Sequence, residues 1–226
     1  MPYHAKIVKI CNFAIDMQNV LYIHGMGGGS DSRIPSILRP VLAEKGIEIH
    51  VRTYDFDPET ASVQILSWVD ELNPSLVIGE SLGTLHALRI TGVPRLFISP
   101  ALNAPFYFEL MAWLTLIPGF TMLFDRIYKP REGDRQKLHF TFRTLRKFRP
   151  YRKKSMDIAL SSGCTGSCFA FIGTRDHYRK TGVVSLKTWK KYFGQSFRLY
   201  EGTHFMEEEH IYSLLVSEIL KVLDIK

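Results

Sequence analysis

The strongest constraint on the fold of this chain is the alternation of short apolar runs with segments of helical periodicity. Short runs rich in β-branched and aromatic side chains predict buried strands, and helical segments such as the one carrying Ile65, Val69 and Leu72 lie between them. Strands that alternate with helices predict an α/β fold, with a mostly parallel central sheet flanked by helices. The predicted strands are residues 20–23, 47–54, 75–78, 95–99, 167–172 and 197–200.

One interval breaks this alternation. More than sixty residues without a strand pattern separate the fourth predicted strand from the fifth, whereas connections in compact domains are usually much shorter. We therefore expect a helical insertion at residues 103–162, between two core segments at residues 1–102 and 163–226. The first half of the insertion, residues 104–124, is apolar apart from Glu109.

The formal net charge of +7 comes from the second half of the insertion. Between Lys129 and Lys154 there are 11 Lys or Arg and 2 Asp or Glu, so the rest of the chain has a balance of −2. One basic segment on a nearly neutral chain argues against a nucleic-acid surface spread over the whole body. Nucleic acid is therefore not expected as a partner.

The cysteines and the first residues bear on location. Cys11, Cys164 and Cys168 are too few for a disulfide framework, and their spacing fits no common zinc or redox motif. We expect three reduced thiols, no bound metal and a cytoplasmic chain. The first fifteen residues lack the apolar core and cleavage site of a signal peptide, and residues 5–15 predict an edge strand.

A serine between two glycines is the first candidate for chemistry. The sequence GESLG at residues 79–83 matches G-x-S-x-G, directly after a predicted strand and at the start of a helical run. In so tight a turn only glycine fits at Gly79 and Gly83, and the serine hydroxyl is lifted clear of the sheet. The helix N-terminus favours negative charge nearby. We predict Ser81 as a nucleophile; an ordinary glycine-lined turn is the alternative.

A second glycine-rich loop, HGMGGGS at residues 24–30, follows the first predicted strand. A backbone free of bulky side chains can aim N–H groups at a developing oxyanion. We predict Met26 N–H and Leu82 N–H as these donors, with Gly25 keeping the loop open. The alternative, a phosphate-binding loop, lacks the Lys-Ser/Thr ending and the G-x-G-x-x-G frame. His24 is expected to form structural hydrogen bonds beneath the loop.

A serine nucleophile needs a base, and the base needs an acid that orients it. His204 follows the last predicted strand, and Asp176 closes the strand before it. Sites in open α/β sheets assemble at the carboxyl ends of strands, so Asp176 and His204 are predicted to act with Ser81. A solvated charged turn is the alternative for Asp176. The competing histidines and aspartates are His86, His139, His177, His210, Asp55, Asp57, Asp125 and Asp157.

These features together resemble the α/β-hydrolase family. The resemblance rests on the order Ser81, Asp176, His204, on the GESLG turn, on the His-Gly-x loop at residues 24–26 and on the G-x-x-D turn at residues 173–176. The chain is most similar to the small bacterial esterase-like members, and the resemblance covers nearly everything outside the insertion. It implies an α/β-hydrolase fold in which the insertion forms a cap over the active site.

The resemblance and the residues predict a serine hydrolase that cleaves a carboxylic ester or thioester. Ser81 attacks the acyl carbon, His204 transfers the proton, and Asp176 fixes the imidazole tautomer. No cofactor is required. An acyltransferase or amidase would use the same residues, and a non-catalytic α/β-hydrolase-fold binding protein is the rival interpretation.

The insertion admits three interpretations, of which a cap is the first. Its aromatic residues, Phe106 and Trp113 among them, then favour an apolar small-molecule acyl substrate. In the second, residues 104–154 contact an anionic membrane surface and the protein is peripheral to the membrane. The third, a transmembrane helix at residues 104–124, is disfavoured by Glu109 and by the Pro-Gly pair within it. The basic run alone predicts a solvated helix face rather than a nucleic-acid site.

Overall fold

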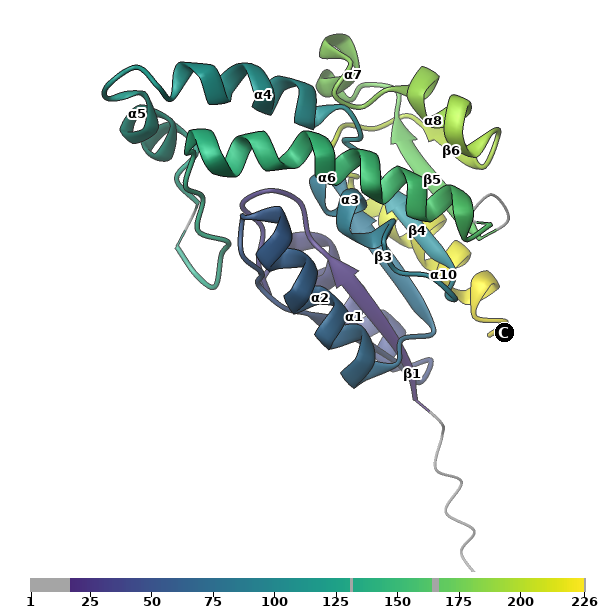
Figure 1. The fold of residues 1–226 in the computed structure, drawn as a ribbon. Coiled ribbons are helices and arrows are strands. Elements are labelled where there is room, and N and C mark those ends of the chain that lie inside the picture. Colours follow the sequence, from purple (N-terminus) through teal and green to yellow (C-terminus); the bar gives the residue numbers. More distant parts are fainter. Residues whose placement is uncertain (1–16, 131, 164–166, 226) are drawn as a thin grey trace, which may run out of the picture.

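The computed structural model describes residues 17–130, 132–163 and 167–225. In this part of the chain six strands form one parallel sheet in the order β2-β1-β3-β4-β5-β6 (Figure 1). The predicted α/β class and parallel sheet are confirmed, while the predicted edge strand at residues 5–15 lies outside the described residues. The strands are β1 (Gln18–Ile23), β2 (Ile47–Val51), β3 (Leu76–Glu80), β4 (Arg95–Ile98), β5 (Cys168–Gly173) and β6 (Phe197–Tyr200).

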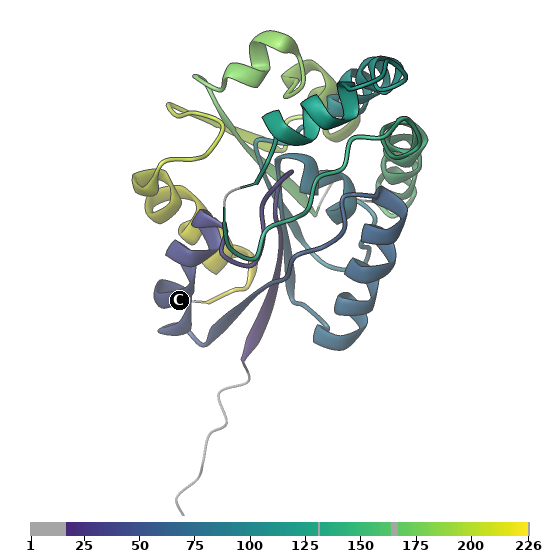
Figure 2. The ribbon, with the colours of Figure 1, turned by 90° about the vertical axis from the view of Figure 1, so that its left-hand side faces the viewer.

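Helices cover both faces of the sheet, as Figure 2 shows along its edge. The inner strands are apolar on both faces because each face packs on helices. One face packs on α1 (Arg33–Ala43) and on the C-terminal segment formed by α9 (Glu208–His210), η3 (Ile211–Val216) and α10 (Ser217–Val222). The other face packs on α2 (Pro58–Leu72), α3 (Thr84–Ala87), α6 (Phe142–Ser161) and α8 (Leu186–Phe193).

Helices occupy much of the interval between β4 and β5. It contains α4 (Ala104–Leu114), α5 (Phe120–Ile127) and α6, and α6 crosses α2 and α3 near the carboxyl ends of the strands (Figure 1). Residues 104–124 thus form two helices rather than one, with a turn at Gly119, whose φ is 89°. No helix among the described residues is both long enough and apolar enough to cross a membrane.

Aromatic side chains join the insertion to the body of the protein. Phe56, which precedes α2, lies with its ring 5.2 Å from those of Phe140 and Phe148, and Phe108 of α4 lies 4.9 Å from Phe148. All four side chains are buried. Each such contact adds to the free energy of the apolar area it buries, so this cluster fixes α4 and α6 on the core.

Several basic residues of α6 contact other parts of the protein. Lys147 Nζ lies 2.6 Å from Asp57 Oδ2, the N-cap of α2, and 2.9 Å from Glu59 Oε2. The hydrogen bond from Lys147 to Asp57 is the main cause of the raised pKa of Lys147. Arg149 pairs with Glu109 of α4, and Arg152 Nε donates to the Leu102 carbonyl at 2.5 Å. The expectation of a simply solvated basic helix face is therefore incomplete.

The cysteine prediction is wrong in one respect. Cys168, at the start of β5, is disulfide-bonded, whereas three reduced thiols were expected; the other two cysteines lie outside the described residues. Four residues after Cys164, Cys168 matched no metal or redox spacing, and spacing alone does not decide whether two thiols pair. The expected cytoplasmic location rested on reduced thiols, and it stays a prediction without that support.

Candidate active site

Ser81 lies on a strained turn directly after β3. It begins the short 3-10 turn η1 (Ser81–Gly83) with φ at 49°, in the left-handed region that side chains other than glycine rarely adopt. A Cβ on Gly79 would lie 2.9 Å from the Ala87 Cβ, and one on Gly83 would collide with the carbonyl oxygen of Ile23. The two glycines therefore permit the close packing that holds the serine in this conformation.

The structure brings the three predicted residues into one hydrogen-bonded chain. His204 Nε2 lies 2.9 Å from Ser81 Oγ, and His204 Nδ1 lies 2.8 Å from Asp176 Oδ2. In the Nδ1–H tautomer, the serine hydroxyl donates to Nε2 and the imidazole donates to the carboxylate. Asp176 and His204 are 2% and 3% exposed, so the hydrogen bond between them is shielded from water, whereas the one from His204 to Ser81 is part-buried.

Asp176 is held in place by its own helix and by the neighbouring loop. It is the N-cap of α7 (His177–Thr181), and its Oδ1 accepts from Tyr178 N–H at 2.8 Å. The Arg175 N–H donates to the Gly202 carbonyl at 2.9 Å, which ties the loop after β5 to the loop that carries His204. One oxygen of the Asp176 carboxylate thus accepts a hydrogen bond from the backbone of α7, and the other accepts one from His204.

Two aromatic side chains that the sequence analysis did not single out enclose His204. The Tyr178 ring lies 4.6 Å from the imidazole, nearly perpendicular to it, and the Phe205 ring lies 5.3 Å away. Phe205 directly follows His204 in the chain, and Tyr178 lies two positions after Asp176. Their proximity in sequence was a usable signal, and both restrict the orientations that the imidazole can adopt.

The glycine-rich loop lies beside Ser81, as its prediction as an oxyanion loop requires. A Cβ on Gly25 would lie 3.1 Å from the Ser81 Cβ, so the backbone here passes close to the serine. Gly28 N–H donates to the Gly25 carbonyl at 3.0 Å and closes a tight turn. Within the described part of the chain, Met26 N–H has no hydrogen-bond partner. Leu82 follows Ser81 in η1 and is buried.

Gln136, a residue of the insertion, holds this loop in place through hydrogen bonds. Its side-chain Oε1 accepts from Gly27 N–H at 3.1 Å, and its Nε2 donates to the Asp55 carbonyl at 3.2 Å. Its backbone N–H donates to the Gly28 carbonyl at 2.7 Å. Gln136 is 1% exposed. No local sequence pattern indicates this contact, which joins residues 109 positions apart.

His24 and His86 lie in the buried layer beneath the loop. The His24 ring stacks on Tyr54 at 4.2 Å, and its Nδ1 lies 2.8 Å from the Gly25 carbonyl oxygen. His86 Nδ1 lies 2.8 Å from the Tyr151 hydroxyl of α6. Burial lowers the pKa of His24 to about 4 and that of His86 to about 3. Both imidazoles are therefore neutral near pH 7 and act as hydrogen-bonding parts of the core.

The competing histidines take no part in the hydrogen bonds of Ser81, His204 and Asp176. His139 pairs with Asp125 at 2.7 Å inside the insertion, and His210 hydrogen-bonds the Glu201 carbonyl at 3.0 Å. The His177 ring is 6.0 Å from that of His204, on the exposed side of α7. Among the described residues, no group of three or more His, Cys, Asp or Glu side chains is arranged to hold a metal.

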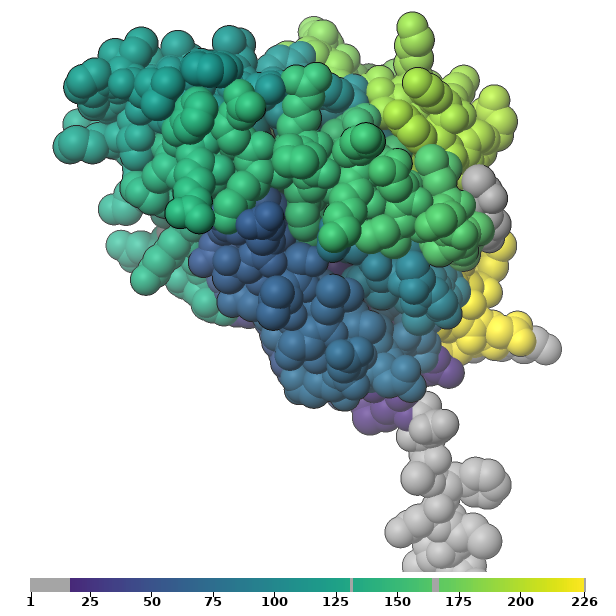
Figure 3. All heavy atoms as spheres, viewed as in Figure 1, coloured from purple at the N-terminus to yellow at the C-terminus, as the bar shows by residue number. Residues whose placement is uncertain are grey.

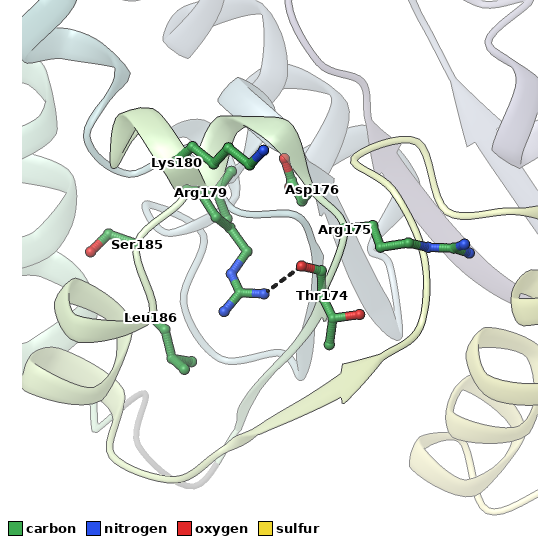
Figure 4. A pocket seen from close by; sticks show the side chains of 8 residues that line it. Thr174, Arg175, Asp176, Arg179, Lys180, Ser185 and Leu186 are labelled. Atoms are coloured by element: carbon green, nitrogen blue, oxygen red, sulfur yellow. Dashed lines mark hydrogen bonds between the residues drawn. The ribbon is translucent and has the colours of Figure 1, made fainter.

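A cavity of about 630 Å³ lies beside the loop that carries Asp176 (Figure 4). Within it Arg179 Nη1 donates to the Thr174 carbonyl at 3.0 Å, while the Arg175 side chain points away toward the next loop. Ser81 and His204 do not line this cavity. The cavity therefore meets the hydrogen-bonded chain only at Asp176. Its lining residues are Thr174, Arg175, Asp176, Arg179, Lys180, Val184, Ser185 and Leu186.

Comparison with known proteins supports the fold described above. No family model matches the sequence, and no curated protein matches it significantly. Among solved structures, Est1E from Butyrivibrio proteoclasticus with ferulic acid bound is similar at a TM-score of 0.61 and 18% identity, over 95% of this chain and 90% of that one. A structure from a study of carboxylesterases of Nitrososphaera gargenis is also similar. Its TM-score is 0.56 and its sequence identity 15%, over 93% of this chain and 92% of that one.

A variant of tomato methylketone synthase I complexed with β-ketoheptanoate is also similar, at a TM-score of 0.60 and 11% identity over 91% of this chain and 99% of that one. The neighbours are esterases and other α/β-hydrolases, and they match over nearly the whole length of both chains. The chain therefore has the α/β-hydrolase fold that the sequence resemblance predicts.

Proposed function

We propose that this protein is a serine hydrolase that cleaves a carboxylic ester or thioester through an acyl-enzyme on Ser81. The observation that carries the proposal is the unbroken hydrogen-bonded chain from Ser81 Oγ through His204 to Asp176. A buried carboxylate, an imidazole and a serine on a strained turn, in that geometry, are the parts that an acyl-transfer reaction needs.

In the proposed mechanism, Ser81 Oγ attacks the acyl carbon while His204 Nε2 takes the hydroxyl proton. Asp176 stabilises the resulting imidazolium through Nδ1. The tetrahedral intermediate collapses, and His204 returns the proton to the leaving alcohol or thiol. Water then attacks the acyl-enzyme with His204 again as the base. This second step releases the acid and restores the Ser81 hydroxyl.

The proposed oxyanion donors are the N–H groups of Met26 and Leu82. Support comes from the close approach of Gly25 to Ser81 and from the Met26 N–H, which has no partner among the described residues. Such donors act best when they are fixed before the reaction begins. Gln136 supplies that rigidity from the opposite side of the loop.

Residues 103–162 are proposed as the cap, with a small apolar acyl compound as the substrate. Helix α4 follows β4 directly, and Phe106 and Tyr107 lie on its exposed side. A cavity of about 420 Å³ between α4 and the end of α7 is lined by Asn103, Phe106, Tyr107, Leu110, Thr181 and Gly182. The names of the structural neighbours, which include carboxylesterases, support an ester as the substrate class.

Steady-state and burst kinetics with p-nitrophenyl esters test this function. We expect turnover of acetate, butyrate and octanoate esters, with an initial burst of p-nitrophenol whose amplitude approaches one per protein when deacylation is slower than acylation. An acyl-thioester series and an anilide series, assayed in parallel, separate esterase from amidase activity. Added alcohols separate hydrolysis from acyl transfer. Absence of turnover across all three series by folded protein would favour the binding protein.

Gln136→Ala is expected to lower kcat for the best ester by roughly ten- to hundredfold, with KM little changed, because the substitution releases the loop that carries an oxyanion donor. The matched control is Gln64→Ala. The Gln64 side chain also accepts a backbone hydrogen bond, from Asp55 N at 2.8 Å, but among the described residues it forms no hydrogen bond to the loop. Equal kcat values for the two variants would contradict the assigned role of Gln136.

A further inference from the structure

The exposed apolar side chains of this protein are concentrated in one part of the surface. Of the 18 large hydrophobic residues that are exposed among those described, 10 lie from Phe106 to Tyr128, on α4, on α5, in the turn that joins them and directly after α5. Met122 is 78% exposed and Leu110 is 64% exposed. Soluble monomers rarely expose contiguous apolar patches of this extent without a partner.

This apolar surface projects from the molecule. Figures 1 and 3 show α4 and α5 extending beyond the sheet on one side, at the upper left of both views. On α4 the exposed residues Phe106, Leu110 and Trp113 follow each other at intervals of four and three positions, so they share one face of the helix. An apolar helix face that projects in this way can contact another apolar surface while the sheet and the helices packed on it stay in place.

The acidic side chain of each of these two helices has a partner inside the protein. Glu109, the acidic residue of α4, pairs with Arg149 and lies 4.0 Å from Arg146. Asp125 of α5 pairs with His139 and accepts the Phe140 N–H at 2.9 Å. On α4 the two arginines outweigh the charge of Glu109, and on α5 the Asp125 carboxylate is turned to His139 and the Phe140 backbone.

Basic side chains border the same surface. The Arg146 guanidinium lies 5.5 Å from the centre of the Trp113 ring, and that of Arg149 lies 5.4 Å from the centre of the Phe106 ring. Arg126, at the end of α5, and Arg143, at the start of α6, are exposed. The surface thus combines aliphatic side chains, an exposed tryptophan and a cationic border, which is the composition of an interfacial membrane-binding surface.

We propose that α4, α5 and the adjoining edge of α6 dock on an anionic lipid bilayer surface. The aliphatic side chains enter the interface between headgroups and acyl chains, Trp113 lies at the level of the headgroups, and the arginines contact lipid phosphates. The charge of this region argues against a second copy of the chain as the occupant. A two-fold interface would bring the same basic border against itself, and like charges in contact oppose association.

Flotation with lipid vesicles tests this docking. Wild-type protein is expected to float with vesicles of phosphatidylglycerol and phosphatidylcholine at about 50 mM salt, and much less at about 500 mM salt or with phosphatidylcholine alone, because salt screens the headgroup attraction. Ser81→Ala is expected to float as well as wild type. The assay is therefore independent of catalysis, and a failure of docking is distinguishable from a failure of the proposed hydrolase activity.

Substitutions separate the apolar and the charged contributions. The double variant Leu110→Glu, Met122→Glu is expected to lose flotation, whereas Val63→Glu, at a position 71% exposed on α2, keeps it. Reversing Arg126 and Arg143 to Glu is expected to weaken binding by at least about 25-fold, at roughly fivefold for each cation. Lys187→Glu, at an exposed position on α8, is the charge control. Circular dichroism verifies that each variant is folded.

Three results would overturn the proposal. The first is no flotation of folded wild-type protein with anionic vesicles at low salt. The second is equal flotation of the wild type and the Leu110→Glu, Met122→Glu variant, which would place the contact elsewhere. The third is a dimer, measured by light scattering, that the same double substitution dissociates, because the apolar face would then be covered by a second copy of the chain.

Discussion

Replacement of Ser81 by alanine is expected to lower kcat for ester hydrolysis by at least about 10⁴-fold, the scale reported for loss of a nucleophile in serine hydrolases of this mechanism. Alanine removes the hydroxyl and keeps the Cβ, so the strained φ of 49° is occupied by an L side chain in both proteins. The fold should be unaffected. Initial rates with the best p-nitrophenyl ester measure the effect.

The matched control for this variant is Ser36→Ala. Ser36 is exposed on α1, and its hydroxyl donates to the Ser32 carbonyl at 2.8 Å. Ser36 is far from the site residues in sequence, and α1 packs on the face of the sheet opposite to α2. Its activity should equal that of the wild type. Retention of a tenth or more of the activity by Ser81→Ala would contradict the assignment of Ser81 as the nucleophile.

Asp176→Asn is expected to lower kcat by about 10⁴-fold near pH 7 with the fold intact. Asparagine keeps an oxygen to accept the Tyr178 N–H, which caps α7 at 2.8 Å. Its amide nitrogen cannot accept from His204 Nδ1–H. The imidazole then favours the other tautomer, in which Nε2 carries the hydrogen and cannot take the serine proton.

The matched control for Asp176→Asn is Asp57→Asn. Asp57 is also an N-cap, of α2, and its Oδ1 accepts from Glu59 N at 3.0 Å, but it belongs to no hydrogen bond of the site. Thermal unfolding monitored by circular dichroism and kcat are measured on both variants. If Asp176→Asn stays within about tenfold of the Asp57→Asn rate, the carboxylate does not orient the histidine.

The sequence predicts the positions of Ser81, Asp176 and His204 for a common physical reason. Each follows a strand whose apolar pattern is readable locally, and the carboxyl ends of parallel strands meet at one edge of the sheet. The strands themselves are found within a few residues of the predicted bounds, the inner ones because they are apolar on both faces and β2 because its apolar and polar residues alternate. Local pattern and strand order suffice to bring these three residues together.

Other features of the site and the fold depend on contacts that no local sequence pattern encodes. Gln136 reaches the loop at Gly27 across 109 residues of chain, and it lies in a segment that the sequence marks only as basic. The same holds for Lys147, whose partners Asp57 and Glu59 begin a distant helix. The disulfide bond of Cys168 was not predicted because the pairing of two thiols depends on their proximity in three dimensions and not on motif spacing.

The most direct test of the central claim is the reaction of the protein with a fluorophosphonate, followed by intact mass and peptide mapping. An activated serine forms a covalent phosphonate ester with loss of fluoride, and an ordinary serine hydroxyl does not react. We predict a single adduct on Ser81 of the wild type, and a much slower reaction in His204→Ala because the base that activates Ser81 is missing. An unreacted Ser81 in folded wild-type protein, or an adduct on another residue, would contradict the proposed mechanism.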